Sequence, residues 1–377
     1  MDFNLTKEQE LLRDGLGKFL SSRYTLETSR AAAKTGIGWQ PEIWRAFADD
    51  LGILGATLPE DAGGTGGGPV ETMVIAEALG HALVVEPFVD TVVVAGGLLH
   101  RAGARSLLEQ VVAGAAVVAL AATETTSGEN WRDVATTARR DGDQWVLNGA
   151  KIMVLNAPLA THLLITARTS GDRADPDGIS LFVIQTDQVA SGFAAHEYRT
   201  VDDRRAADLD FTDLRLPADA LLGAEGQAWA SLERARDEGA AAVCAEAVGG
   251  MRKVLANTVE YCKQRQQFGQ PIGRFQALQH RMVDMHMEVE QAAAAVYLAV
   301  LNLESAPAIR AKAVSAAKAT IGRAARFVGQ NAVQLHGGMG MTEELAIGHY
   351  FKRLTAVQYE FGTTDSHVSR YAELTRP

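Results

Sequence analysis

The chain has 377 residues, of which 47% are apolar and 22% charged, so it is long enough for two or three packed units of an ordinary globular protein. Its net charge of −10 argues against a nucleic-acid partner, because an acidic surface repels a phosphate backbone. The cysteines, Cys244 and Cys262, lack metal-ligand spacing and predict neither a metal site nor a disulfide framework. The sequence shows no signal-peptide pattern and no bilayer-length apolar run, which predicts a cytoplasmic protein without a membrane partner.

Residues 1–115 are predicted to form an N-terminal helical domain. Thr6 is a candidate N-cap for a first helix, in which apolar residues recur on one face. A second helix carries Ile43, Trp44 and Phe47 at helical spacing, and a third begins near Pro69.

Residues 116–225 change to an alternating pattern typical of short strands. Asp141-Gly142 marks a hairpin turn between two of these segments. Several short strands joined by turns predict a small antiparallel barrel or sandwich as the central domain.

Residues 226–377 return to a helical pattern and predict a C-terminal four-helix bundle. The first long helix contains Gly249-Gly250, a pair that permits close helix packing. The last bundle helix is expected to start at Thr342, with Glu343 and Glu344 in its first turn. The fold class is therefore α+β, in the order helices, β-domain, helices.

Three stretches of the bundle sequence contain candidate functional residues. In "RQQFGQPIGRFQ", Arg265 offers a bidentate phosphate contact and Phe268 an aromatic face, although the stretch also fits a plain interhelical connection. In "QLHGGMGMTEE", glycines precede an expected helix N-terminus, which favours an anion; a tight turn is the alternative. In "YEFGTT", Glu360 is expected at the end of the last bundle helix, as a base or as a solvated carboxylate.

Together these stretches resemble the acyl-CoA dehydrogenase family, and the resemblance covers the whole chain. It implies FAD as the cofactor, held by Arg265, Phe268, Gln334 and Gly338 with contributions across a subunit boundary, and joined by Thr363. It also implies an acyl-CoA substrate that is desaturated between its α- and β-carbons. The electrons would pass to an electron-transferring flavoprotein.

The sequence departs from the common family pattern around the catalytic base. Counting back from Gly362-Thr363 places Phe361 at the usual base position, with Glu360 one residue early. Some members carry the base on the first bundle helix instead, at a position that falls here on Gly239, beside Glu238. The expected base is Glu360, and Glu238 is the alternative.

A second departure is Met153 and Leu155, where the family usually has Trp and Thr or Ser against the flavin ring. The departures resemble a bacterial subgroup that includes pimeloyl-CoA dehydrogenase small-subunit-like chains and heteromeric dehydrogenases. The resemblance therefore implies a homotetramer, or a heterotetramer with a paralogous subunit. Two alternatives stay open: a non-catalytic or site-completing subunit, and a different flavin oxidation on the same scaffold.

Overall fold

The computed structural model describes residues 4–189 and 191–376. Its contacts divide into two compact units, which we call the helical unit and the mixed unit. The division does not follow the order of the chain, because each unit combines separate segments. The domain boundaries expected from the sequence, after residues 115 and 225, therefore stay a prediction. The helical unit comprises Met1–Arg30, Pro69–Val84 and Ala240–Pro377, and the mixed unit Ala31–Gly68 and Val85–Gly239.

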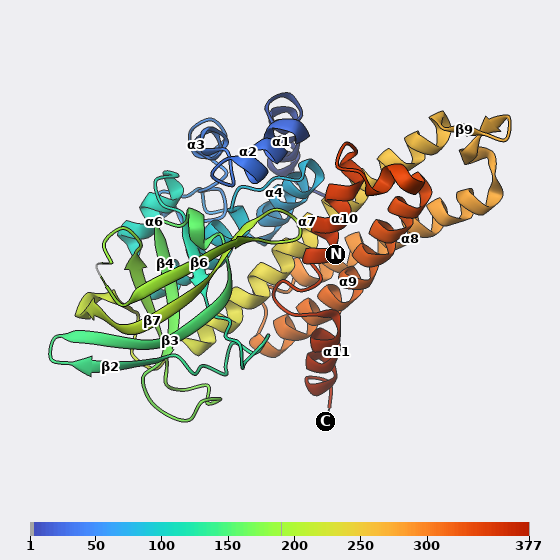
Figure 1. Cartoon of the computed structure of the whole chain (residues 1–377). Helices are drawn as coiled ribbons and strands as arrows, with labels where there is room; N and C mark the ends of the chain where they lie inside the picture. Colours follow the sequence, from blue (N-terminus) through green and yellow to red (C-terminus); the bar gives the residue numbers. More distant parts are fainter. Residues whose placement is uncertain (1–3, 190, 377) are drawn as a thin grey trace. The chain divides into compact units, whose positions relative to one another are not determined.

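The helical unit is organised around the long helix α9 (Figure 1), which contacts α8, α10 and α11. Most of α9 is buried, and its many alanines let neighbouring helices approach closely. The helices lying wholly or partly in this unit are α1 (Lys7–Arg23), α4 (Pro69–Ala82), α7 (Trp229–Gln264), α8 (Gln276–Val300), α9 (Pro307–His336), α10 (Ala346–Ala356) and α11 (Thr364–Glu373). Between α7 and α8 lie the two-residue strands β9 (Gln266–Gln267) and β10 (Gln270–Pro271) and the short helix η5 (Ile272–Arg274).

The expected start of the first helix is confirmed. The Thr6 hydroxyl accepts a hydrogen bond from the backbone N–H of Gln9 at 3.3 Å, and the Gln9 side chain accepts one from the N–H of Thr6 at 2.9 Å. This reciprocal pair is a capping box, which satisfies backbone donors that a helix N-terminus leaves open.

Helices α4 and α7 touch through their backbones at two glycines of the helical unit. A Cβ atom at Gly80 would lie 1.9 Å from the carbonyl oxygen of Glu246, and one at Gly249 would lie 1.9 Å from that of Glu77. Any side chain would force the two helices apart. The close packing expected from Gly249 is thus confirmed.

The expected start of the last bundle helix at Thr342 is wrong. Residues Gly337–Met341 form a short 3₁₀ helix, η6, and α10 begins only at Ala346. The glycines disfavour continuous helix, and Leu345 is extended, so Glu343 and Glu344 precede α10 instead of forming its first turn.

The mixed unit contains an eight-stranded sheet in the order β6-β7-β3-β2-β4-β5-β8, with β1 added parallel to β4. The sheet confirms the strand-rich middle of the chain. Its strands are β1 (Val118–Ala121), β2 (Thr137–Asp141), β3 (Gln144–Leu155), β4 (His162–Arg168), β5 (Ile179–Gln185), β6 (Phe193–Arg199), β7 (Arg205–Pro217) and β8 (Leu221–Leu222). Its helices include α2 (Leu26–Thr35, whose first turn is in the helical unit), α3 (Pro41–Asp49), α5 (Gly96–Ala102) and α6 (Arg105–Val112); a π-helix, η2 (Val89–Ala95), leads into α5.

The predicted hairpin joins β2 to β3. Asp141 pairs with Gln144 across the turn, and Gly142 has the left-handed φ of +61° that a tight hairpin requires. The buried face of the sheet packs apolar side chains such as Trp145 and Phe182, whose rings meet edge-to-face with centroids 5.2 Å apart.

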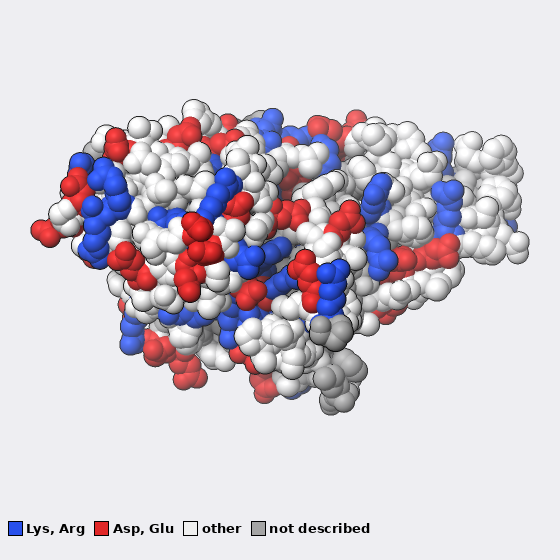
Figure 2. Space-filling model, turned by 90° about the horizontal axis from the view of Figure 1, so that it is seen from below, with Lys and Arg blue, Asp and Glu red and all other residues white. Residues whose placement is uncertain are grey.

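Acidic and basic side chains are interspersed over the face of the molecule seen in Figure 2. Among the described residues, no helix has both the length and the hydropathy needed to cross a bilayer. Cys244 and Cys262 are free and buried, and burial raises the pKa of the Cys244 thiol to about 12.

We expect Gly249→Ala to lower the free energy of unfolding by about 1–3 kcal/mol, because the added methyl overpacks the α4–α7 contact. Gly15→Ala is the matched control, since a Cβ at Gly15 meets no atom within 4 Å. It should be neutral or stabilising by up to about 1 kcal/mol. Urea denaturation of both variants measures the difference, and equal effects would contradict the contact.

Candidate active site

The turn formed by residues 357–363, between α10 and α11, carries Glu360 and Phe361. Lys318 of α9 is fully buried beneath it, and its ammonium donates to the carbonyl oxygens of Val357 at 2.9 Å, Gln358 at 3.3 Å and Gly362 at 2.8 Å. Three carbonyls that would otherwise lack partners at a helix end thus share one cation.

A second contact fixes the turn at Phe361. Its carbonyl oxygen accepts a hydrogen bond from Nε2 of buried His367 at 3.0 Å, and Nδ1 of that ring lies 3.2 Å from the hydroxyl of Ser315. A carbonyl only accepts, so Nε2 carries the proton, and in the neutral ring Nδ1 accepts from Ser315. Phe361 has a φ of +57°, which a bulky residue adopts only when its surroundings enforce it.

Glu360 is not at a helix end, contrary to expectation, because α10 stops at Ala356. Both its carboxylate oxygens accept hydrogen bonds from Arg353, one of them at 3.0 Å. Arg353 also binds Glu246 of α7 through two bonds, at 2.6 and 3.0 Å. Only 6% of the Arg353 and Glu246 side chains and 11% of Glu360 are exposed.

In this buried cluster the Arg353 guanidinium lies between two carboxylates, and it stays positively charged. Burial alone lowers the pKa of Arg353, but the carboxylates of Glu246 and Glu360 outweigh burial and raise it well above its usual value. Glu360 therefore serves as a counter-ion of Arg353 in this conformation.

Glu238, the alternative base, lies in the part of α7 that belongs to the mixed unit. Its Oε1 accepts hydrogen bonds from Arg101 at 3.1 Å and from Arg234 at 2.8 Å, and 16% of its side chain is exposed. Its buried Oε2 has no hydrogen-bond partner among the described residues. A Cβ at Gly97 would come within 2.9 Å of that oxygen, so Gly97 keeps the space beside it free of a side chain.

The two sequence stretches expected to hold FAD meet at one end of the helical unit, which we call the hairpin end (residues 261–275 and 334–341). Tyr261, near the end of α7, stacks on His336, the last residue of α9, with ring centroids 4.3 Å apart. Arg265 follows Tyr261 by one helical turn, and Gly338 follows His336. The stack therefore brings the segments of Arg265 and Gly338 together.

The hairpin end is exposed and largely uncharged. Phe268 at the β9–β10 tip is 90% exposed and has a left-handed φ of +54°. Gln334 and Gly338 are also exposed, and a Cβ at Gly338 would meet no atom within 4 Å. The end of the molecule that carries β9 in Figure 1 is mostly free of charged side chains in Figure 2.

Thr363 lies elsewhere in the helical unit. It caps α11, its hydroxyl oxygen accepting from the N–H of Ser366 at 3.2 Å. The adjacent Thr364 approaches α9 at Gly322, where a Cβ would lie 2.3 Å from the Thr364 hydroxyl. Gly322 and Gln334 are 12 positions apart, which at about 1.5 Å per residue is about 18 Å along the helix.

In the mixed unit, Met153 lies on a strongly bent part of β3, with a φ of +54° and 52% of its surface exposed. Its N–H donates to Asp208 at 2.9 Å. Nearby in sequence, fully buried Lys151 donates to Glu124 at 2.6 Å and to Thr166 at 2.8 Å. Burial lowers the pKa of Lys151 to about 8 despite the attraction of Glu124, so the ammonium remains charged at neutral pH.

Sequence reasoning missed Glu246, Arg353 and Lys318. A usable signal existed for two of them, because Lys318 interrupts the apolar run "VSAAKATIG" and Glu246 interrupts "AAAVCAEAVGG". A charged residue inside such a run is buried, and a buried charge needs a partner. The sequence does not identify Arg353 as that partner for Glu246.

The chain thus has an α+β fold with a central sheet between two helical segments of the chain, and arginines hold both of its candidate bases. Models of the acyl-CoA dehydrogenase N-terminal, middle and C-terminal domains match residues 6–117, 119–214 and 226–374. The chain belongs to the acyl-CoA dehydrogenase family and is an oxidoreductase.

Relatives and solved structures agree with this family. Acyl-CoA dehydrogenase FadE12 of Mycobacterium tuberculosis is 32% identical over 361 residues, covering 91% of this chain and 89% of the relative. Butyryl-CoA dehydrogenase of Megasphaera elsdenii superimposes with a TM-score of 0.88 at 26% identity, covering 99% of both chains. A chain of the Tcur3481–Tcur3483 steroid acyl-CoA dehydrogenase variant gives 0.87 at 29%, covering 98% and 97%, and a PigA–FAD complex gives 0.90 at 26%, covering 99% and 98%.

We expect Lys318→Met to lower the free energy of unfolding by about 3 kcal/mol or more, because two buried carbonyl oxygens and a partly buried one lose their donor. Lys263→Met is the control, since Lys263 is exposed and its effect should stay within about 0.5 kcal/mol. Chemical denaturation checks both variants, and a Lys318→Met protein as stable as the control would show that the ammonium does not support the turn.

Proposed function

We propose that this chain is an FAD-dependent acyl-CoA dehydrogenase subunit that converts an acyl-CoA thioester to its trans-2-enoyl form, with electrons passing to an electron-transferring flavoprotein. Family membership supports the reaction class, and the PigA complex supports FAD on this scaffold. The observation that carries the proposal is the hairpin end, where both candidate cofactor segments meet.

The residues of the hairpin end fit a dinucleotide. Exposed Phe268 offers a face for a planar ring, Arg265 offers a fork of donors for a diphosphate, and the open backbone at Gly338 permits close approach of a ligand. Bound FAD would accept the β-hydride of the substrate. Thr363 adjoins Thr364, which approaches α9 at Gly322, about 18 Å along the helix from Gln334. We therefore propose that Thr363 and the residues of the hairpin end that hold one FAD come from two different subunits.

The chain's own task in the reaction is to take the α-proton. We propose Glu238 as the better-placed base, because its Oε2 has no competing hydrogen bond. Arg101 and Arg234 hold Oε1 and thereby orient the carboxylate, and the absence of a side chain at Gly97 lets Oε2 lie close to α5 without a clash. A carboxylate oxygen without a competing hydrogen bond can take up a proton without first breaking another contact.

Glu360 remains the alternative base. Both of its oxygens bind Arg353, so at least one of those bonds must break before it can accept a proton from carbon. Glu246 would then remain bound to Arg353 and keep the guanidinium paired. The exchange is feasible, but it requires a rearrangement that Glu238 does not need.

A second candidate function is a site-completing subunit of a heteromeric dehydrogenase. Phe361 and Gly239 occupy the two positions at which the family carries its base, and Glu360 is engaged by Arg353. The similar Tcur3481–Tcur3483 steroid acyl-CoA dehydrogenase, whose name gives two components, supports an assembly of this kind. The catalytic role is compatible with a homotetramer or a heterotetramer, whereas the site-completing role requires a heterotetramer with a paralogous subunit.

The test is anaerobic bleaching of the flavin in the purified chain, titrated with a panel of acyl-CoAs. We expect Glu238→Gln to slow bleaching at least 100-fold with FAD retained, as removal of a general base typically does. Glu360→Gln should retain most of the wild-type rate in protein that is folded. Glu109→Gln, on the exposed face of α6, serves as the control for the charge change.

Loss of bleaching in Glu360→Gln alone would make Glu360 the base. Wild-type protein that binds FAD but bleaches only after a paralogous subunit is added would favour the site-completing role. Wild-type protein that binds no FAD, alone or with such a partner, would contradict the proposed function.

A further inference from the structure

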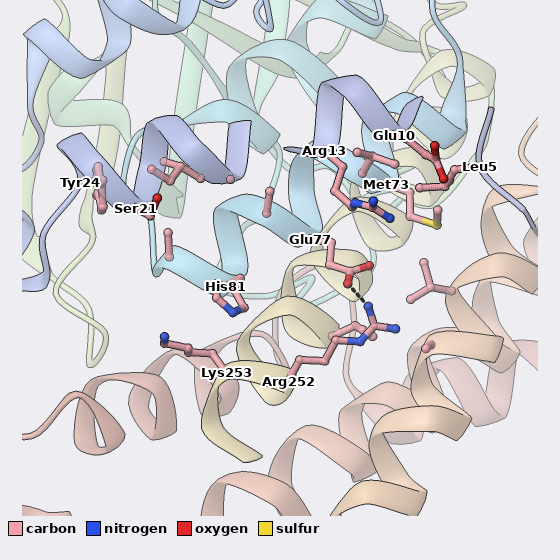
Figure 3. Close-up of a pocket in the computed structure, with 18 of the residues that line it drawn as sticks. Leu5, Glu10, Arg13, Ser21, Tyr24, Met73, Glu77, His81, Arg252 and Lys253 are labelled. Carbon is pink, nitrogen blue, oxygen red and sulfur yellow. Dashed lines mark hydrogen bonds and ion pairs between the residues drawn. The ribbon is translucent and has the colours of Figure 1, made fainter. Parts of the chain in front are cut away.

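The helical unit contains a cavity of about 820 Å³ that none of the proposed FAD or base residues lines. It lies among α1, α4, α7, α8 and α10 (Figure 3). Small-molecule sites typically occupy about 300–1,000 Å³, so the cavity is large enough for a ligand with a substantial body.

The cavity has room for a ligand because its walls carry small residues, including Ala78, Ala293, Ala346 and Gly17. A Cβ at Gly17 would meet no atom within 4 Å. Glycine inside a helix costs about 1 kcal/mol relative to alanine, and close packing does not account for it here. Its absence of a side chain enlarges the space beneath α1.

The inner walls of the cavity are apolar. Leu20, Met73, Val74, Val248 and Val296 line it, and each is at most 5% exposed. Such walls favour a hydrocarbon body, because the ligand removes its apolar surface from water there.

The polar residues of the cavity form two groups (Figure 3). In one, Arg252 is paired with Glu77, and Arg13 lies close to both. In the other, Lys253 lies beside His81, whose pKa is lowered by burial and then by Lys253 and Arg252. His81 is therefore neutral at pH 7 and adds no second positive charge there.

Lys253 is the charge that the cavity leaves uncompensated. It is half-buried, and within the described part of the chain no carboxylate lies at ion-pair distance from it. Glu10 and Glu77 also line the cavity, so a ligand with several negative charges would be repelled. A single negative charge fits this arrangement best.

We propose that the cavity binds an amphipathic monocarboxylate, with its carboxylate at Lys253 and its hydrocarbon body against Leu20, Val74 and Val248. The contact would pair the Lys253 ammonium and fill an apolar space at the same time. The proposal is independent of FAD binding and of the identity of the base.

Isothermal titration of the purified full chain tests this site, with decanoate below its micelle concentration as the probe and decanol as its neutral match. We expect saturable binding of decanoate and at least tenfold weaker binding of decanol. Lys253→Gln should weaken decanoate at least tenfold and bring it close to decanol. Gly17→Met, which fills the wall, should weaken both ligands at least tenfold.

Two controls are built into the same helices. Lys263→Gln on α7 removes an exposed charge outside the cavity, and Gly15→Met on α1 adds a side chain where it meets no atom and does not line the cavity. Both should bind decanoate within twofold of wild type. The proposal is overturned if wild type shows no saturable binding, or if the control variants lose as much affinity as Lys253→Gln. It is equally overturned by a third outcome, in which Lys253→Gln binds decanoate as tightly as wild type and an acyl-CoA displaces that decanoate.

Discussion

Arg353 is the residue on which the arrangement of the helical unit around the 357–363 turn depends. It lies on α10 and binds a carboxylate from α7, Glu246, and one from the turn itself, Glu360. Because all three side chains are almost completely buried, removing Arg353 would leave two carboxylates without their cation in a low-dielectric interior, whereas removing either carboxylate would leave Arg353 paired with the other. The constraint therefore acts on two helices and a turn at once.

Further contacts also restrain the 357–363 turn. The Lys318 ammonium gathers three carbonyls, and His367 donates to Phe361, which is thereby held in a left-handed conformation. The backbone contact at Gly249 keeps α7 against α4, so Glu246 reaches Arg353 from a fixed helix. A turn restrained from several sides is poorly suited to move a carboxylate, which is the physical reason for preferring Glu238 to Glu360 as the base.

Much of the fold could be predicted from the sequence, because its signals are local. The Thr6 capping box, the Asp141-Gly142 hairpin and the Gly249 contact each depend on residues close in the chain or on one residue type. The start of α10 was missed because helical periodicity does not show that glycines and an extended Leu345 interrupt the helix. The family motifs predict the cofactor segments, and that assignment stays a prediction.

The ion cluster could not be predicted, because Glu246 and Arg353 are 107 positions apart and nothing local marks their pairing. The same holds for the free Oε2 of Glu238, which depends on the placement of Arg101 and Gly97. The cavity likewise results from small residues on four separate helices. Features of this kind arise from packing between distant segments, and only coordinates reveal them.

The central claim is that Glu360 is a structural counter-ion of Arg353. A double-mutant cycle between Arg353→Met and Glu360→Gln, measured by urea denaturation, tests it most directly. We expect Arg353→Met alone to cost about 3–5 kcal/mol, and the addition of Glu360→Gln to recover at least about 1 kcal/mol, because it removes a carboxylate left without its partner. Effects of the two substitutions that simply add, within about 0.5 kcal/mol, would contradict the claim.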